Sequence, residues 1–185
     1  SPARPTPPRS TPRRRPARAG RESSSFPLQM ERVPARYSEG MLLYLDMCCL
    51  KRPFDDQSQS RIRLETEAVL GLMAAESASL QFIRSAALWL ENEQNPLPVR
   101  AARVRRWLGD PQPLVNAADV AARTNELITH GFGSFDAFHL ASAEAAGADA
   151  IGTCDDRLLS LARRVAGVLR VRVVGVVQLA DEVLS

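Results

Sequence analysis

Residues 41–46 read MLLYLD, a run of five apolar residues that ends at a carboxylate. A short apolar run without polar alternation is typical of a strand that is buried on both faces of a parallel sheet. Comparable runs predict further strands at 80–83, 113–115, 148–153 and 171–177. Apolar residues at helical spacing predict helices at 61–76, 86–109 with a break near Pro96 and Pro98, 117–129, 135–146 and 156–166. This alternation predicts an α/β fold, namely a three-layer α/β/α domain with a mostly parallel sheet.

The region before residue 41 differs in composition from the rest of the chain. Residues 1–40 hold 9 Arg, 3 Glu and 8 of the 13 prolines, whereas acidic residues outnumber basic ones over 41–185. Proline-rich, charged sequence of this kind cannot form a packed core. We therefore expect a disordered basic tail over 1–40 and one domain over 41–185. The basic balance of the whole chain belongs to the tail and does not by itself indicate a nucleic-acid-binding surface on the domain.

Several protein classes are excluded by what the sequence lacks. No apolar run approaches the roughly 18 residues that a membrane-spanning helix needs. The three cysteines are an odd number without a CxxC pair, which favours a reducing, cytoplasmic location, and they are interpreted as small core residues. Neither GxxxxGK[ST] nor GxGxxG occurs, so P-loop and dinucleotide-binding proteins are disfavoured.

Acidic residues stand where ligands bind in such a sheet, at the carboxyl ends of the strands. Asp46 closes the first strand, and both Asp155 and Asp156 follow the strand expected at 148–153. The carboxyl ends of parallel strands share one edge of the sheet. We therefore expect these carboxylates to lie close together.

Two further acidic positions belong to predicted helices. Glu91 lies about two helical turns after Ser85, and its neighbour Glu93 leaves the register open. Asp136 is expected in the first turn of a helix, with Ser134 as its N-cap. Four acidic positions are thus expected to converge on one edge of the sheet.

A cluster of carboxylates requires a positive counterion. Histidine is scarce and Lys51 is the only lysine, so no internal cation is expected to neutralise the cluster. Mg²⁺ or Mn²⁺ held by carboxylates would suit attack of water on a phosphodiester.

His139 is interpreted as an ordinary polar helix residue rather than a general base. A basic cluster that could bind RNA phosphates or simply form a solvated face comprises Arg100, Arg103, Arg105 and Arg106.

At these residues the sequence resembles the PIN domain, the nuclease fold of VapC-type toxins. The stretches that carry the resemblance are Leu45–Asp46, Ser85–Glu91, Ser134–Ala143 and Thr153–Leu159. The resemblance implies a metal-dependent endoribonuclease in which Asp46, Glu91, Asp136 and Asp155 form the acidic quartet. Its Thr-x-Asp spacing favours Asp155 over Asp156.

The resemblance also has implications for partners. It implies an RNA substrate, a homodimer and silencing by a small antitoxin protein. Apolar residues on the predicted helices exceed what one small sheet needs to cover, which also favours association; they are Ile62, Val69, Met73, Leu88, Trp89 and Val104. PIN domains often follow the first Asp with Thr and a small polar residue, whereas Met47 and Cys48 follow Asp46 here. The alternative function is therefore a catalytically silent PIN-like module that binds RNA or protein.

Overall fold

The computed structural model describes residues 40–110 and 116–185 of the chain. Four strands form one sheet, in which all neighbours are parallel and the order is β2-β1-β3-β4. The strands are β1 (Met41–Leu45), β2 (Leu80–Phe82), β3 (Ala150–Thr153) and β4 (Arg172–Gly175). The expected tail up to residue 39 and the expected strand at 113–115 lie outside the described residues.

Strand β1 lies inside the sheet because its sequence is apolar on both faces. Leu43, Tyr44 and Leu45 are completely buried. Leu43 pairs with Phe82 of β2 on one side and with Ala150 of β3 on the other. A continuous apolar run is expected for such a strand, whereas an edge strand would tolerate alternation with polar residues.

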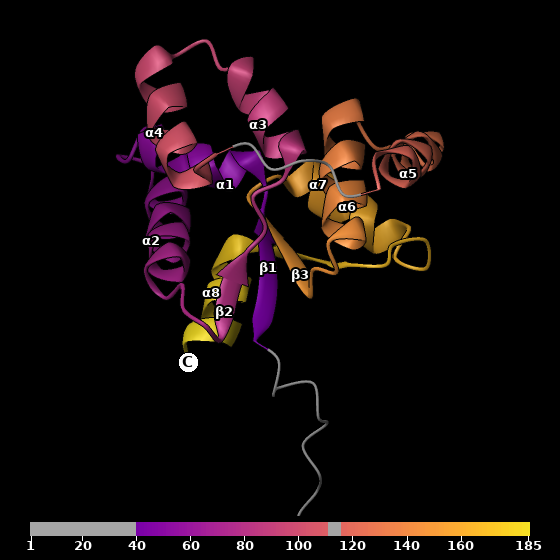
Figure 1. The fold of residues 1–185 in the computed structure, drawn as a ribbon. Coiled ribbons are helices and arrows are strands. Elements are labelled where there is room, and N and C mark those ends of the chain that lie inside the picture. Colours follow the sequence, from indigo (N-terminus) through magenta and orange to yellow (C-terminus); the bar gives the residue numbers. More distant parts are fainter. Residues whose placement is uncertain (1–39, 111–115) are drawn as a thin grey trace, which may run out of the picture. The chain divides into compact units, whose positions relative to one another are not determined.

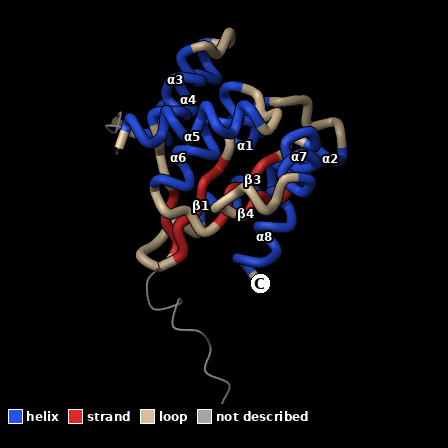
Figure 2. The backbone as a smooth tube through the Cα atoms, turned by 90° about the vertical axis from the view of Figure 1, so that its right-hand side faces the viewer, coloured by secondary structure: helices blue, strands red, loops and turns tan. Residues whose placement is uncertain are grey.

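Helices cover both faces of this sheet, and further helices lie beyond its carboxyl edge (Figure 1). Helix α2 (Ser60–Ala74) packs against α8 (Val176–Leu184) on one face. The other face is covered by α5 (Ala117–Thr129), α6 (Ser134–Ala145) and α7 (Asp156–Arg164), and Figure 2 shows α5 and α6 in front of the strands. The elements near the carboxyl edge are α1 (Met47–Lys51), the 3₁₀ turn η2 (Arg52–Phe54), α3 (Ala86–Glu93) and α4 (Pro98–Leu108). The predicted three-layer α/β/α arrangement is confirmed.

The last predicted strand, 171–177, is wrong over its final residues. Strand β4 ends at Gly175, and Val176 already belongs to helix α8. Val176, Leu179 and Ala180 are buried at helical spacing, so this apolar run continues into a helix that covers the sheet. Short apolar runs do not distinguish the end of a strand from the start of a buried helix.

No helix within residues 40–110 and 116–185 has the length and apolar character needed to cross a membrane.

Candidate active site

Asp46 lies immediately after the central strand β1, where the chain turns into helix α1. Its Oδ1 accepts a hydrogen bond from the backbone N–H of Met47 at 2.7 Å, so the side chain caps this helix. Its Oδ2 accepts from Thr153 Oγ1 at 2.8 Å and from Cys48 Sγ at 3.0 Å. Only 5% of Asp46 is exposed, and burial raises the pKa of its carboxyl well above the usual range. The hydrogen bonds therefore fix the direction of both oxygens, while burial disfavours the ionised form of the carboxyl.

Cys48 and Thr153 provide the polar support that the sequence around Asp46 seemed to lack. Thr153, the last residue of β3, is fully buried; its hydroxyl donates to Asp46 and accepts from the backbone N–H of Asp155 at 3.1 Å. Cys48 contacts Thr153 Oγ1 at 3.2 Å as well as Asp46. The interpretation of all three cysteines as plain core residues is wrong for Cys48, because its sulfur makes polar contacts and lies only partly buried.

Helix α3 brings Glu91 toward Asp46. The helix begins after Ser85, whose Oγ accepts from the backbone N–H of Leu88, and Glu91 lies in its last turn. Glu91 Oε1 is 2.7 Å from Lys51 Nζ, and Glu91 Oε2 is 2.7 Å from His139 Nε2. Burial alone would raise the pKa of Glu91, but the hydrogen bonds from His139 and Lys51 outweigh it and lower the pKa. Glu91 is therefore held in the ionised form.

Lys51 corrects the expectation that the acidic cluster has no internal cation. Lys51 ends helix α1 and spans the gap to α3, where its ammonium group forms the ion pair. Lys51 was considered at the sequence level only as an isolated lysine, because nothing in its spacing indicates that α1 and α3 meet.

His139 is also more than the ordinary polar helix residue that the sequence suggested. It is 1% exposed, and its Nδ1 lies 2.7 Å from the hydroxyl of Tyr44, which in turn lies 2.6 Å from Ser85 Oγ. An ionised carboxylate can only accept, so His139 Nε2–H donates to Glu91, while Nδ1 shares its hydrogen bond with the Tyr44 hydroxyl. Burial raises the pKa of Tyr44 well above its usual value, which keeps the hydroxyl available as a donor. A polar chain from Ser85 thus ends at Glu91.

Asp136 lies in the first turn of α6, as predicted, but its helix is capped differently. Helix α6 begins at Ser134 and its N-cap is Gly133, without a side-chain cap, so the expected role of Ser134 as N-cap is wrong. A side chain at position 133 would bring its Cβ to 3.1 Å from Asp136 Oδ2. Burial, and next the charge of Asp155, raise the pKa of Asp136.

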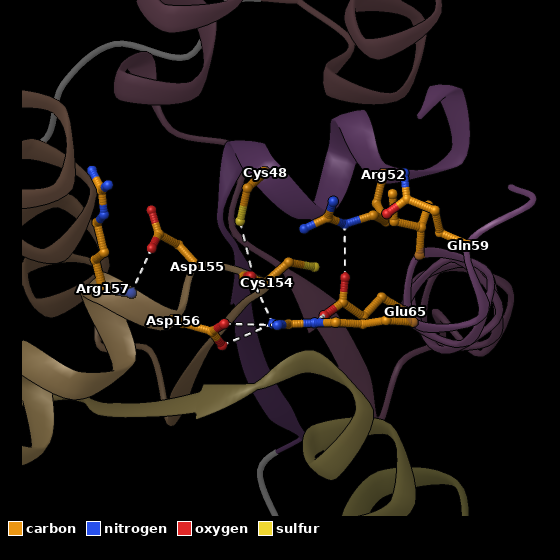
Figure 3. Close-up of a pocket in the computed structure, with 10 residues that line it drawn as sticks. Cys48, Arg52, Gln59, Glu65, Cys154, Asp155, Asp156 and Arg157 are labelled. Carbon is orange, nitrogen blue, oxygen red and sulfur yellow. Dashed lines mark hydrogen bonds and ion pairs between the residues drawn. The ribbon is translucent and has the colours of Figure 1, made fainter. Parts of the chain in front are cut away.

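The structure gives Asp155 and Asp156 different surroundings (Figure 3). Asp155 is the N-cap of α7, and its Oδ1 accepts from the backbone N–H of Arg157 at 2.7 Å. Asp156 is the first residue of that helix and makes two hydrogen bonds to Arg61, at 2.7 and 2.8 Å. The negative charge of Asp155 raises the pKa of Asp136. The backbone N–H of Asp155 donates to the Thr153 hydroxyl, which donates to Asp46. The charge of Asp156 is instead paired with Arg61 on the surface.

Glu91 and Glu93 are separated by the same criterion. Glu93 pairs with Arg105 Nη2 at 2.6 Å, and its side chain is 55% exposed. Glu91 faces the interior of the site and is bound there from two sides. The structure therefore brings Glu91, not Glu93, to Asp46.

Within the part of the chain that the structure describes, one group of side chains close enough to hold a metal ion comprises Asp46, Glu91 and His139. One potential ligand atom from each lies within 4.8 Å of the other two. Asp136 and Asp155 lie outside this tight group, although the charges of Asp155 and Glu91 both raise the pKa of Asp136. Carboxylate oxygens converging from separate elements fit Mg²⁺ or Mn²⁺, which prefer oxygen donors and complete their shell with water and phosphate oxygens.

Comparison with known families adds to this geometry. The PIN domain family matches residues 58–164. The chain belongs to the PIN domain family. No curated protein and no solved structure matches the chain. The matched segment of this PIN domain includes Glu91, Asp136 and Asp155 and begins after Asp46.

The family gives the site its general chemistry. PIN domains are generally metal-dependent nucleases, they act on RNA or other nucleic acid, and they typically bind divalent metal ions. In this PIN domain, a group that could hold such an ion consists of Asp46 after β1, Glu91 of α3 and His139 of α6. Interpretation of the sequence did not identify Lys51, Thr153 and Tyr44 as parts of this site. The only signals for them were a single lysine, a threonine ending a strand and a hydroxyl group in an otherwise apolar run.

Proposed function

We propose that this PIN domain is a Mg²⁺- or Mn²⁺-dependent endoribonuclease that hydrolyses RNA phosphodiester bonds. The observation that carries the proposal is the approach of Asp46 and Glu91, from separate elements, at the carboxyl edge of a parallel sheet. Asp136 and Asp155 complete the proposed acidic quartet. A bound divalent ion would lower the pKa of the attacking water and stabilise charge on the leaving oxygen.

The protein's own contribution would be to hold the ligands in fixed directions. Thr153 and Cys48 fix one carboxylate oxygen of Asp46. His139 and Lys51 fix the two oxygens of Glu91. Ligands that are already oriented lose little freedom when they bind an ion, and supporting hydrogen bonds of this kind typically change metal affinity 10- to 100-fold when removed.

A catalytically silent module remains the competing function, and one observation favours it. Glu91 already has a cation in Lys51, and Asp46 already accepts three hydrogen bonds. A site satisfied in this way has less need of a metal ion. The assay described next decides between the two functions.

The decisive experiment is cleavage of fluorescently labelled single-stranded or hairpin RNA with and without Mn²⁺ or Mg²⁺. Glu91→Gln is expected to reduce the rate at least about 100-fold. Glu93→Gln removes the same charge from the same helix at a residue paired on the surface, and it should retain the wild-type rate. Cleavage undiminished by EDTA would refute the metal-dependent mechanism, and RNA binding without any cleavage would favour the silent module.

The proposed biology is the toxin of a type II toxin–antitoxin pair in the cytoplasm. An antitoxin would be a small protein that covers the acidic site, and an arginine is suited to pair with its carboxylates in two places at once. Co-expression with the small protein encoded next to this chain should abolish cleavage. Cleavage that persists in a stable complex of the two would refute the pairing.

A homodimer is also part of the proposal, but its support differs from the sequence argument. Val69, Leu88 and Val104, counted there as surplus apolar surface, are buried in the core of the domain. The apolar residues that are exposed near α3 and α4 are Leu90, Leu97 and Val99, of which Val99 is 74% exposed. Light scattering should give twice the chain mass of 20.3 kDa. The mass of a single chain at micromolar concentration would refute the dimer.

A further inference from the structure

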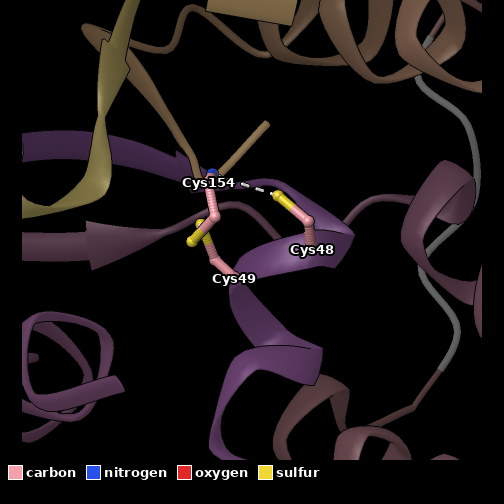
Figure 4. A group of neighbouring side chains, drawn as sticks. All are labelled: Cys48, Cys49 and Cys154. Carbon is pink, nitrogen blue, oxygen red and sulfur yellow. Dashed lines mark hydrogen bonds between the residues drawn. The ribbon is translucent and has the colours of Figure 1, made fainter. Parts of the chain in front are cut away.

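The three cysteines of the chain, its only ones, lie together (Figure 4). Cys48 and Cys49 belong to α1, and Cys154 follows β3, more than 100 residues later in the sequence. Their sulfur atoms all lie within 4.8 Å of one another, and the sulfurs of Cys49 and Cys154 are 3.6 Å apart. The fold itself creates this group, because β1 and β3 are adjacent and both end at the same edge.

The spacing of these sulfur atoms matches that of thiolates around one soft metal ion. With a Zn–S bond of about 2.3 Å and tetrahedral angles, two sulfur ligands are about 3.8 Å apart. The observed separations need to change by about 1 Å or less to reach this value. All three cysteines are free thiols.

A metal ion could also reach the group from solvent. A surface pocket of about 450 Å³ is lined by both Cys48 and Cys154 (Figure 3). Cys49 lies behind them, fully buried, and its sulfur faces the carbonyl of Gly152. Three sulfurs with an open side toward a pocket leave room for water as a fourth ligand.

The contacts of Cys48 and Cys154 are unlike those of apolar core residues. The backbone N–H of Cys154 donates to Cys48 Sγ at 3.1 Å, and Cys48 Sγ also contacts Asp46 and Thr153. A sulfur atom that accepts a backbone N–H hydrogen bond is already supported in the way that metal-bound thiolates are supported by neighbouring donors.

We infer that Cys48, Cys49 and Cys154 form a binding site for one thiophilic ion, Zn²⁺ being the most available example. This site is distinct from the carboxylate group, because soft sulfur donors select Zn²⁺ or Cu⁺ whereas oxygen donors suit Mg²⁺ and Mn²⁺. A bound ion would link α1, which directly follows Asp46, to the residue that follows β3. The inference does not depend on nuclease activity.

The test uses Cd²⁺ as a spectroscopic substitute for Zn²⁺. Chelator-treated full-length protein, kept reduced, is titrated with Cd²⁺ while the ultraviolet charge-transfer band of cadmium thiolate is recorded. We expect saturation at one ion per chain, a titration shifted to higher Cd²⁺ concentration when excess Zn²⁺ is present, and no response to Mg²⁺. Since the chain has no other cysteine, any thiolate band must come from this group.

Variants separate this site from the carboxylate site. Cys154→Ser and Cys48→Ser should each weaken Cd²⁺ binding at least about tenfold, whereas Glu91→Gln should leave the band intact. Zn²⁺ should raise the melting temperature of the wild-type protein and leave that of Cys154→Ser unchanged, because only a ligand that binds the folded state stabilises it. Zn²⁺ should also protect the wild-type thiols from alkylation, a measurement that needs no variant.

Several results would overturn the inference. These are the absence of a cadmium band in reduced protein, an unchanged band in Cys154→Ser, or one ion shared between two chains. A disulfide between Cys49 and Cys154 that persists in protein purified under reductant, detected as the loss of two hydrogen atoms by mass, would also exclude the metal site.

Discussion

At the scale of single residues, Asp46 combines two roles that usually belong to different side chains. Oδ1 caps α1 and lies 4.0 Å from His139 Nε2, and Oδ2 is held by Thr153 and Cys48. The sequence could predict that a carboxylate ends the central strand, but it could not separate an N-cap from a ligand. In the structure Asp46 caps α1 and also lies close to Glu91 and His139, so its position is compatible with both descriptions.

Replacing Asp46 by Asn tests this division. An amide oxygen can still cap the helix, whereas the negative charge needed to hold a cation is lost. We expect RNA cleavage to fall at least about 100-fold and the free energy of unfolding at neutral pH to stay equal or increase. Chemical denaturation and the cleavage assay measure the two effects. Glu67→Gln, a charge removed from an exposed position of α2, is the control. A clearly destabilised Asp46→Asn protein would show that the charge itself is structural.

The raised pKa of Asp46 predicts a pH dependence with a definite sign. Burial raises its pKa in the folded protein, so folding favours the protonated carboxyl. This contribution to stability is present at low pH and is lost as the pH rises through the folded-state pKa. The stability of metal-free wild type relative to Asp46→Asn should therefore decrease as the pH rises above about 4, the ordinary pKa of an aspartate. Thermal melts of both proteins in EDTA measure the difference, and a difference that grows with pH would contradict the raised pKa.

At the scale of elements, α1 and α3 are joined by an ion pair that would raise the metal concentration required to occupy the proposed site. Lys51 at the end of α1 holds Glu91 in the last turn of α3 through a half-buried ion pair. A cation that binds Glu91 must compete with this ammonium group. The ammonium group of Lys51 would therefore compete with a metal ion for Glu91.

Lys51→Met removes this competitor and should lower the metal concentration for half-maximal cleavage about fivefold, equivalent to roughly 1 kcal/mol for a partly exposed pair. Lys51→Arg keeps the charge and should behave like the wild type. The measurement is a Mn²⁺ titration of the cleavage rate. If Lys51→Met requires more Mn²⁺ instead, Lys51 orients Glu91 rather than competing for it.

Elements differ in how far the sequence could predict them. The helix at 117–129 was predicted with its observed ends, because its polar and apolar residues alternate at helical spacing. Helix α8 was missed since its first residues continue the apolar run of β4, and α1 was missed since five residues are too few to show a period. Asp46 and Asp155 could be proposed from strand ends, and Glu91 and Asp136 from predicted helices. The pairing of Lys51 with Glu91 could not, because it depends on how two short helices meet.

At the scale of the whole molecule, the charge is divided between two regions of the sequence. Residues 1–40 have a charge of +6, and the domain that follows is acidic overall. Deleting residues 1–39 should leave the unfolding midpoint and the Mn²⁺ requirement unchanged. RNA binding should weaken only at salt concentrations below about 0.1 M, because contacts between arginines and phosphates are screened by salt. Denaturation and RNA titrations at two salt concentrations test this, and an insoluble deletion protein would contradict it.

The ion pair between Lys51 and Glu91, together with the hydrogen bond from His139, also bears on whether the protein can fold without a metal ion. Repulsion at Glu91 is already relieved by residues of the same chain. The folded state therefore does not need a divalent ion to form, unlike a zinc finger, which is unfolded without its metal. Under the proposed function, folding would precede metal binding, and the ion would be needed for cleavage alone.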